Sequence, residues 1–385
     1  MPDTSESLEL SVLDGIGRVD PAEWDACAGT DNPFLSHAFL LALEDSRSTG
    51  PKTGWLPRHL ALRDASGRLI GGVPAYVKSH SYGEYVFDHA WANAYERAGG
   101  RYYPKLQVAV PFTPVTGPRL LVRPDAPDGA ARLLIGGLEQ VAERLGVSSV
   151  HATFPIASEW EAFGEAGWLL RLGYQFHWRN EGYGSFEDFL AALSSRKRKA
   201  IRKERESVAA SGLTLRTLTG GEITARHWDA FHRFYEGTVD RKWGWAYLTR
   251  DFFHMLGERL GDRVVLVVAE DDGRPVAGAL NLRGADALYG RNWGAAGEYP
   301  NLHFEACYYR AIDFAIAHGL ARVEAGAQGE HKIARGYLPV RTYSAHWIAD
   351  PGLRDAVDDF LRRERPSVDL QIAAMMEESP FRKEG

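Results

Sequence analysis

Short apolar runs with a two-residue period alternate along the chain with longer stretches whose apolar residues recur every three or four positions. Residues 61–77 and 268–283 form a matched pair among the short runs. Each reads as an apolar strand, an acidic turn containing Gly-Arg, and a second apolar strand, which is the pattern of a β-hairpin. Because strand patterns alternate with helix patterns throughout, the chain is predicted to have a mixed α/β fold.

The hairpins belong to a longer internal repeat. In each copy we match a Tyr-Pro-x-Leu motif, at Tyr103 and Tyr299. A helical pattern then ends at a glycine, Gly146 or Gly319, and is followed by a short strand. Glycine is the residue most often found directly after a helix, so both positions are read as helix ends. The matching order of elements predicts a diverged duplication.

Composition and charge narrow the class of protein. A length of 385 residues fits two domains, and the repeat divides them into residues 1–178 and 179–385. The formal net charge of -6 argues against general coating of nucleic acid or anionic membrane. The two cysteines lie far apart, so neither a disulfide framework nor a metal site is predicted. Without a signal-like N-terminus or a long apolar window, we expect a cytoplasmic protein with no transmembrane segment.

Long motifs along the chain resemble those of a known family. They are NPFLSHAFLLALE, PFTPVTGPRLL, SSRKRKAIRKERE, FYEGTVDRKWGWAYLT, YPNLHFEACYYRAIDFAIAHG and EAGAQGEHKIARGYLPVRTYSAHW. They are similar to the bacterial FemAB-like proteins of peptidoglycan biosynthesis or recognition, and the element order resembles a tandem pair of GNAT-like acyltransferase domains. The resemblance to Fem-type aminoacyltransferases implies amide formation with acyl-CoA or aminoacyl-tRNA as co-substrate and no tightly bound cofactor. It also implies a small-molecule or peptidoglycan-precursor acceptor.

Acyl transfer to an amine needs a base, donors for the developing oxyanion and a proton source for the leaving group. Residues 326–337, GAQGEHKIARGY, follow a predicted strand and collect such groups. The catalytic candidates are Glu330, His331, Lys332 and Tyr337, and Gln328 and Arg335 are substrate-binding candidates. "HKIARGY" resembles the Phe-Lys-x-Gly-Phe pattern of Fem-type enzymes, with one additional residue between Lys332 and Gly336. The alternative reading of this stretch is a solvated loop.

A second cluster is strongly basic. Residues 194–206, SSRKRKAIRKERE, follow Ser185 and Asp188, whose spacing predicts a helix start, and one helix is expected to end before Gly212. Such a helix could hold a diphosphate or the acceptor stem of a tRNA, which is thus a candidate partner. The phosphate-binding candidates here are Lys197, Arg198, Lys199 and Arg202. The alternative is a charged, solvated face.

A third motif, RNWGAA, matches the letters of the pyrophosphate loop in CoA-dependent GNAT enzymes through Arg291 and Gly294. It lies several residues before the helix expected to begin near Leu302, and a β-turn explains it equally well. Further substrate-binding candidates are Thr116 and Arg119 on the Pro-rich segment 111–129, Trp243, Tyr299 and Glu305. His303 and the pair Asp88 and His89 carry less weight, because a lone histidine more often has a structural role.

The sequence therefore predicts an N-acyltransferase whose site lies in a cleft between the repeats and is formed chiefly by the second. In the first copy, the position equivalent to residues 326–337 holds only HATFPIASE, residues 151–159, so one active site is expected. Three alternatives stay open. One is a CoA-dependent N-acetyltransferase of a small amine, and another is a non-catalytic protein that recognises a cell-wall precursor. The third is an RNA-binding accessory protein that uses the basic helix from Arg196 to Arg205.

Overall fold

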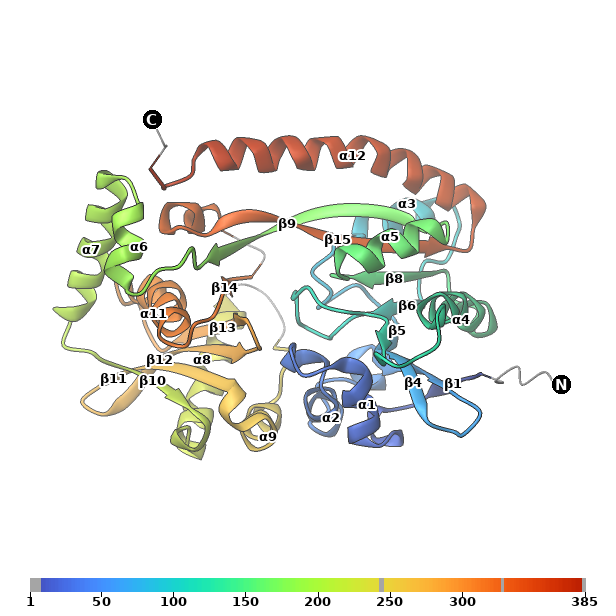
Figure 1. The fold of residues 1–385 in the computed structure, drawn as a ribbon, viewed down its shortest axis with the longest axis horizontal. Coiled ribbons are helices and arrows are strands. Elements are labelled where there is room, and N and C mark those ends of the chain that lie inside the picture. Colours follow the sequence, from blue (N-terminus) through green and yellow to red (C-terminus); the bar gives the residue numbers. More distant parts are fainter. Residues whose placement is uncertain (1–7, 242–245, 327–328, 383–385) are drawn as a thin grey trace. The chain divides into compact units, whose positions relative to one another are not determined.

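The computed structural model describes residues 8–241, 246–326 and 329–382 (Figure 1). The chain forms two compact units. One comprises Met1–Gly173 with Thr342–Asp369, and the other comprises Tyr174–Arg341 with Leu370–Gly385. The predicted division between residues 178 and 179 lies inside a strand, and the exchange of the C-terminal segments has no counterpart in the sequence repeat. Within the described ranges, no helix is both long and apolar enough to cross a bilayer.

Both units contain a sheet with a helical connection between two parallel strands. The first unit contains β1 (Glu9–Leu13), α1 (Pro21–Ala28), α2 (His37–Asp45), β2 (Trp55–Pro57), β3 (His59–Arg63), β4 (Leu69–Val73), β5 (Ala75–Lys78), α3 (His89–Arg97), β6 (Lys105–Val108), β7 (Leu121–Val122), α4 (Ala130–Leu145), β8 (Ser149–Thr153) and α5 (Ala157–Glu165). Three elements begin in one unit and end in the other: β9 (Leu169–Arg179), β15 (Leu338–Ile348) and α12 (Pro351–Glu377).

The second unit repeats this plan. It contains α6 (Phe186–Ala192), α7 (Ser195–Ala209), β10 (Thr214–Thr219), α8 (Ala225–Arg241), α9 (Arg250–Leu260), β11 (Val264–Asp271), β12 (Arg274–Arg283), β13 (Ala287–Ala295), α10 (Leu302–Phe304), the π-helical turn η6 (Glu305–Tyr309), α11 (Arg310–Ala317), β14 (Arg322–Glu324) and the 3₁₀ helix η7 (Glu330–Arg335). Strand β6 pairs in parallel with β8, as β13 does with β14. The predicted mixed α/β fold with an internal duplication is confirmed.

One detail of the predicted repeat is wrong. Tyr103 precedes the first strand of its parallel pair, β6, whereas Tyr299 follows the corresponding strand β13, so the two tyrosines are not equivalent. The hairpin turns and the helix ends do match, because Gly146 and Gly319 both adopt the left-handed conformation with φ of 63° and 64°. The Tyr-Pro-x-Leu motif occurs twice by chance and gave a wrong alignment of the two copies. The glycines at the helix ends are required by backbone geometry and gave a correct alignment.

The stretch from Ser185 to Gly212 was expected to form one helix, but it forms two, and the basic segment lies in the second. Ser185 caps α6 by accepting a hydrogen bond from the backbone N–H of Asp188, as predicted. The helix then ends at Leu193, which has extended backbone angles and forms an isolated β-bridge with Phe381. Helix α7 begins two residues later. A bridge to a segment almost two hundred residues away cannot be read from helical periodicity, so the break was not foreseen.

The core of the second unit explains which face of its sheet remains polar. Trp178, Leu288 and Val323 pack against Ile312 of α11, which covers β13 and β14 on this side (Figure 1). Alternate residues of the same strands point to the opposite face. His177 and Glu324 are neighbours there in the pairing of β9 with β14. The polar row on this second face lines the features described below.

The first unit carries a buried polar network on the equivalent face of its sheet. Lys105 is fully buried, and its ammonium contacts Asp88 and Glu84, with a Nζ–Oε2 distance of 2.7 Å to the latter. Nearby, the Nδ1 atoms of His151 and His346 are 2.7 Å apart, so one of the two rings must carry the shared proton. These ionisable groups come from separate strands and not from residues 151–159 alone, and the expectation of a single active site stays a prediction.

Candidate functional site

The parallel strands β13 and β14 separate at the centre of the second unit. They pair over only three positions, from Ala287 opposite Arg322 to Tyr289 opposite Glu324. Strand β13 then continues to Ala295 without β14 beside it. A bulge marks the point of separation, because Asn281 of β12 pairs with Gly290 and Leu280 pairs with Asn292, which leaves Arg291 as the additional residue.

A cavity of about 90 Å³ occupies the opening between the separated strands. Its wall combines β12 and β13 with side chains of the helical segment, namely His303, Cys307 and Tyr308. Gly290 packs closely against the strand end at Glu324, since a Cβ atom there would lie 3.3 Å from the carbonyl oxygen of Glu324. The volume corresponds to about three water molecules at roughly 30 Å³ each. The cavity is therefore sized for a small group.

The helical wall of this cavity is irregular. Residues Glu305–Tyr309 form a π-helical turn between α10 and α11. Such turns insert one residue into a helix and often occur at functional sites. Burial raises the pKa of the Cys307 thiol well above its usual range. The thiol therefore stays protonated, which makes Cys307 a poor nucleophile and agrees with a direct transfer that forms no enzyme intermediate.

His331 meets this wall from η7. Its Nε2 atom lies 2.9 Å from the hydroxyl of Tyr308, and its ring lies beside those of His303 and Phe304. Burial, together with the charges of Arg335 and Lys332, lowers the pKa of His331 below 6.5. Burial also raises the pKa of Tyr308 well above its usual range. A neutral imidazole hydrogen-bonded to a protonated phenol results, and the pair can both accept and donate a proton.

Lys332 is a buried cation of η7, close enough to the Cys307 thiol of the cavity wall to interact with it electrostatically. It is 3% exposed, and its ammonium donates a hydrogen bond of 3.0 Å to the carbonyl of Gly326. Burial lowers the pKa of Lys332 to about 8, while the Cys307 thiol acts in the opposite direction. The positive charge of Lys332 also helps to lower the pKa of His177 on β9, an effect that burial dominates. Lys332 therefore acts electrostatically on both the cavity wall and the polar face of β9.

Two other residues of the predicted cluster hold this arrangement together. Arg335 makes a two-pronged ion pair with Glu204 of α7, at 2.7 and 3.2 Å, and donates to the carbonyl of His331. Its guanidinium also lies 3.4 Å from the ring centroid of Phe304. Tyr337 is fully buried, and its hydroxyl donates to the backbone carbonyl of Tyr308 at 3.1 Å. Both side chains position the Tyr308–His331 pair rather than face the cavity.

The remaining candidates of the second unit have other surroundings. Glu305 is buried and binds Arg205 and Arg310, each at 3.0 Å. Tyr299 packs in an apolar cluster around Leu302. Arg291 lines the cavity, whereas Gly294 lies in β13 under α8, where a Cβ atom would be 2.4 Å from the backbone of Phe234. Gln328, Trp243 and the side chain of Glu330 lie outside the described residues.

The basic side chains of α7 that were predicted to bind phosphate differ in their exposure to solvent. Lys199 and Arg202 are exposed, Lys197 and Arg198 are half-buried, and Arg202 forms an ion pair with Glu187. Arg205 anchors the helix by pairing with Glu305 and Asp313. The outward side chains of α7 thus remain available to a phosphate-bearing partner, while the inward arginine fixes the helix on the segment that carries Tyr308.

Arg119 and Thr116 belong to the first unit. Arg119 is fully buried and donates to the carbonyl oxygens of Val115, Gly117 and Thr153 at 2.8 to 3.0 Å. The backbone carbonyl of Thr116 accepts a hydrogen bond from Asn32. Arg119 therefore stabilises the conformation of the Pro-rich loop through hydrogen bonds to its backbone. This structural role accounts for the arginine, and no ligand is needed to explain it.

On the helical wall of the cavity, sequence reasoning named His303 but missed Cys307 and Tyr308. Their spacing from Phe304 places them on a helix face, and that pattern alone reads as core. The signal that distinguishes Tyr308 is its contact with His331, which only the folded chain shows.

The duplicated mixed α/β fold, with a parallel pair of strands in each unit, is that of a tandem pair of GNAT-like domains. The chain belongs to the FemAB-like family, described as peptidoglycan biosynthesis/recognition, whose model matches residues 15–383. A search of the curated proteins finds no match.

Solved structures share the fold over nearly the whole chain. FemX is similar with a TM-score of 0.55 at 11% identity, over 88% of this chain and 98% of FemX. The C-terminal domain of a putative lysylphosphatidylglycerol synthetase from Agrobacterium fabrum gives 0.55 at 10% identity, over 90% and 97%. L-PGS from Bacillus licheniformis gives 0.51 at 11% identity, over 86% and 98%. At these identities the likeness establishes the fold.

Proposed function

We propose that the second unit transfers a small acyl or aminoacyl group from an activated carrier to an amine, with the reacting carbonyl in the cavity between β13 and β14. The observation that carries this proposal is the cavity itself, an opening of about 90 Å³ bordered by Tyr308 and adjoined by His331 and Lys332. Its size favours groups of a few heavy atoms, such as acetyl, glycyl or alanyl.

The contacts suggest a role for each side chain. His331 is neutral near pH 7 and takes a proton from the attacking amine as the new C–N bond forms. The ammonium of Lys332 stabilises the negative charge that develops on the carbonyl oxygen. The phenol of Tyr308 gives its proton to the leaving oxygen or sulfur as that bond breaks, and His331 then returns the amine's proton to Tyr308. One proton thus passes from amine to leaving group.

The donor is either acyl-CoA or aminoacyl-tRNA. Gly294 supports helix packing, so the RNWGAA motif gives no argument for a CoA pyrophosphate, whereas α7 offers outward basic side chains. We therefore favour aminoacyl-tRNA as donor and the amine of a peptidoglycan precursor as acceptor, in the cytoplasm, where charged tRNA is made. A CoA-dependent acetyltransferase of a small amine is the alternative.

A donor panel tests this function. Transfer from glycyl- and alanyl-tRNA, leucyl-tRNA, acetyl-CoA and butyryl-CoA to a lysine-containing precursor should favour the small groups of one carrier class. Lys332→Met should lower turnover by about 100-fold or more, since it removes transition-state stabilisation, whereas Lys52→Met, at an exposed position of the first unit, should leave turnover unchanged. Precursor binding without turnover of any donor would instead support a recognition protein.

The helix α7 provides an independent test of the carrier. Replacing Lys197, Arg198 and Lys199 by glutamine should weaken tRNA binding and reduce the steepness of its salt dependence by up to about 0.7 for each phosphate that the helix no longer neutralises. Binding of acetyl-CoA serves as the comparison. An unchanged salt dependence would return these side chains to the role of a solvated face.

A further inference from the structure

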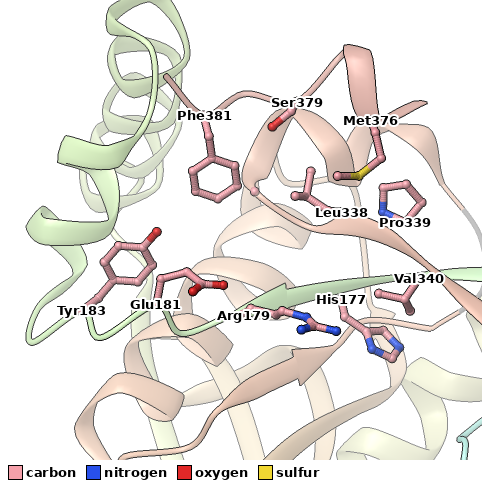
Figure 2. A pocket seen from close by; sticks show the side chains of 11 residues that line it. His177, Arg179, Glu181, Tyr183, Leu338, Pro339, Val340, Met376, Ser379 and Phe381 are labelled. Atoms are coloured by element: carbon pink, nitrogen blue, oxygen red, sulfur yellow. The ribbon is translucent and has the colours of Figure 1, made fainter. Parts of the chain in front are cut away.

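The second unit contains another cavity, of about 470 Å³, that none of the roles above uses (Figure 2). Its volume lies in the range of sites that hold small organic ligands, about 300 to 1,000 Å³. Three segments that are distant in sequence form its walls: the end of β9 with the following turn, the start of β15, and the chain around Ser379. A ligand there would contact parts of the chain that only folding brings together.

One wall is a row of polar side chains. His177, Arg179, Glu181 and Tyr183 follow one another at every second position (Figure 2). The intervening Phe176 and Trp178 point to the opposite face and are buried in the core. Because side chains alternate across a strand, burial of the aromatic residues fixes the direction of His177 and Arg179. His177 and Arg179 are thus held in place by the core, and Tyr183, beyond the end of β9, packs against Trp178 and Phe189.

Arg179 and Glu181 carry opposite charges that the described parts of the chain do not pair. The side chain of Arg179 is exposed and has no hydrogen bond or ion pair within the described ranges. Its charge helps to lower the pKa of His177, although burial and the charge of Arg322 have larger effects. Arg322, opposite Arg179 in the pairing of β14 with β9, is bound by Glu324 and Asp286. Two neighbouring arginines therefore differ, and only Arg179 keeps its donors for another partner.

The facing wall is apolar. Leu338, Pro339 and Val340 at the start of β15 contribute to it, together with Met376 and Phe381 (Figure 2). Met376 is 43% exposed, although an unbranched thioether side chain usually finds a place in a core. A backbone bridge between Leu193 and Phe381 and a hydrogen bond from Ser194 to Pro380 hold the last segment in position. The apolar wall is therefore part of the fold.

We propose that this cavity binds an apolar α-amino acid or short peptide by its two charged ends. Arg179 receives the carboxylate, Glu181 receives the ammonium, and the apolar side chains lie against Leu338, Val340 and Met376. The Cα atoms of Arg179 and Glu181 can be at most about 7 Å apart, which matches the length of an extended dipeptide. A ligand with one charge would leave the other side chain of the pair unmatched, so the zwitterion fits best.

The test measures binding to the intact protein by calorimetry, and it is independent of the proposed transfer because no donor is present. The probes are Leu-Leu, N-acetyl-Leu-Leu, Leu-Leu-amide and leucine. Leu-Leu should bind about 10-fold or more tightly than either blocked form, since each blocked end loses a charge-assisted hydrogen bond. Comparable binding of leucine would identify a free amino acid as the source, and weaker binding of leucine would identify a peptide.

Two variants assign the ends. Arg179→Gln should abolish the preference for the free carboxylate and keep the preference for the free amine, whereas Glu181→Gln should do the reverse. Arg216→Gln, which changes an exposed arginine on β10, serves as control and should leave all affinities unchanged. Thermal unfolding checks that the variants are folded. No binding of Leu-Leu at millimolar concentration, or both preferences intact in Arg179→Gln and Glu181→Gln, would overturn the proposal.

Discussion

His331 and Lys332 are adjacent in the sequence, yet their surroundings differ. His331 is exposed at the end of the cavity, and Lys332 is 3% exposed behind it. The 3₁₀ helix η7 separates the two side chains, and the clamp of Arg335 on Glu204 holds that helix against α7. One short segment thus supplies an accessible base and a buried cation.

The proposed roles predict a bell-shaped pH dependence of kcat. His331 must be neutral to accept a proton, so activity should rise with pH through its lowered pKa, below 6.5. Lys332 must be charged, so activity should fall as pH rises through about 8. In Lys332→Arg, a guanidinium stays protonated at high pH, and the alkaline limb should disappear below pH 10. A limb that stays near pH 8 in this variant would remove Lys332 from the mechanism.

The two tyrosines of the site should respond differently to loss of the hydroxyl. Tyr308→Phe should lower turnover by about 100-fold, since Tyr308 gives the proton to the leaving group. Tyr337→Phe should keep turnover within a few-fold and lower the free energy of unfolding by about 1 kcal/mol, because the carbonyl of Tyr308 loses its donor. Kinetics and urea unfolding of both variants check this, and equal losses of turnover would restore Tyr337 as the proton donor.

At this scale the sequence revealed ionisable residues but not their directions. A strand end followed by a polar cluster was enough to select His331 and Lys332. Tyr337 and Arg335 belong to the same polar cluster, and the sequence does not distinguish them from His331 and Lys332. Their partners, the backbone carbonyl of Tyr308 and the carboxylate of Glu204, belong to other segments of the unit. Tyr308 was missed for the converse reason, since its partner lies in η7.

Among the elements, β13 and α8 depend on an unusually close approach. Gly278 and Gly294 face Phe231 and Phe234, and the backbone of Phe234 occupies the space of a side chain at Gly294. Helix α8 can therefore lie directly on the strand that borders the acyl cavity. The letters of a phosphate-binding motif and the requirement of close packing select the same residue type, which is why the sequence alone could not separate them.

Substitution of this glycine tests the packing. Gly294→Ala should lower the free energy of unfolding by about 1 to 3 kcal/mol, because the new methyl group forces α8 away from β13. Gly221→Ala places its methyl group in open space and should change stability by no more than about 0.5 kcal/mol. Denaturant unfolding of the two variants gives the comparison, and equal stabilities would show that α8 can move without cost.

Over the whole molecule, the first unit retains a dense charged interior although the second carries the proposed chemistry. Lys105 is surrounded by Glu84, Asp88 and the hydroxyl of Ser81. Removal of one member leaves the others buried and unpaired. Lys105→Met should therefore lower the free energy of unfolding by about 3 to 5 kcal/mol, measured in urea.

A control substitution distinguishes the loss of the buried ion network from a general sensitivity of the first unit to the replacement of lysine by methionine. Lys52→Met alters an exposed lysine of the same unit and should be close to neutral in the same assay. If Lys105→Met were equally neutral, the network would contribute no more than a surface ion pair.

The duplication was visible in the sequence because hairpin turns and helix ends leave local signals. The exchange of segments was not, since the period of β15 is that of a strand whichever sheet it enters. Its first residues border the cavity with Arg179, and its last residues, from Ser344 to Ile348, pair with β8 of the first unit. Local sequence patterns specify whether a segment forms a helix or a strand. Which strand it pairs with depends on the relative stability of all possible strand pairings.

This exchange of C-terminal segments determines when each unit can complete its folding during synthesis of the chain. The first unit lacks a strand until residues beyond 341 have emerged from the ribosome, and the second lacks the wall around Phe381 until that segment has emerged as well. Domains usually fold one after the other as they are made. Here each unit remains incomplete until a C-terminal segment has been synthesised. Both units should therefore become resistant to proteases late and at nearly the same time, once the segment around Phe381 is free to fold.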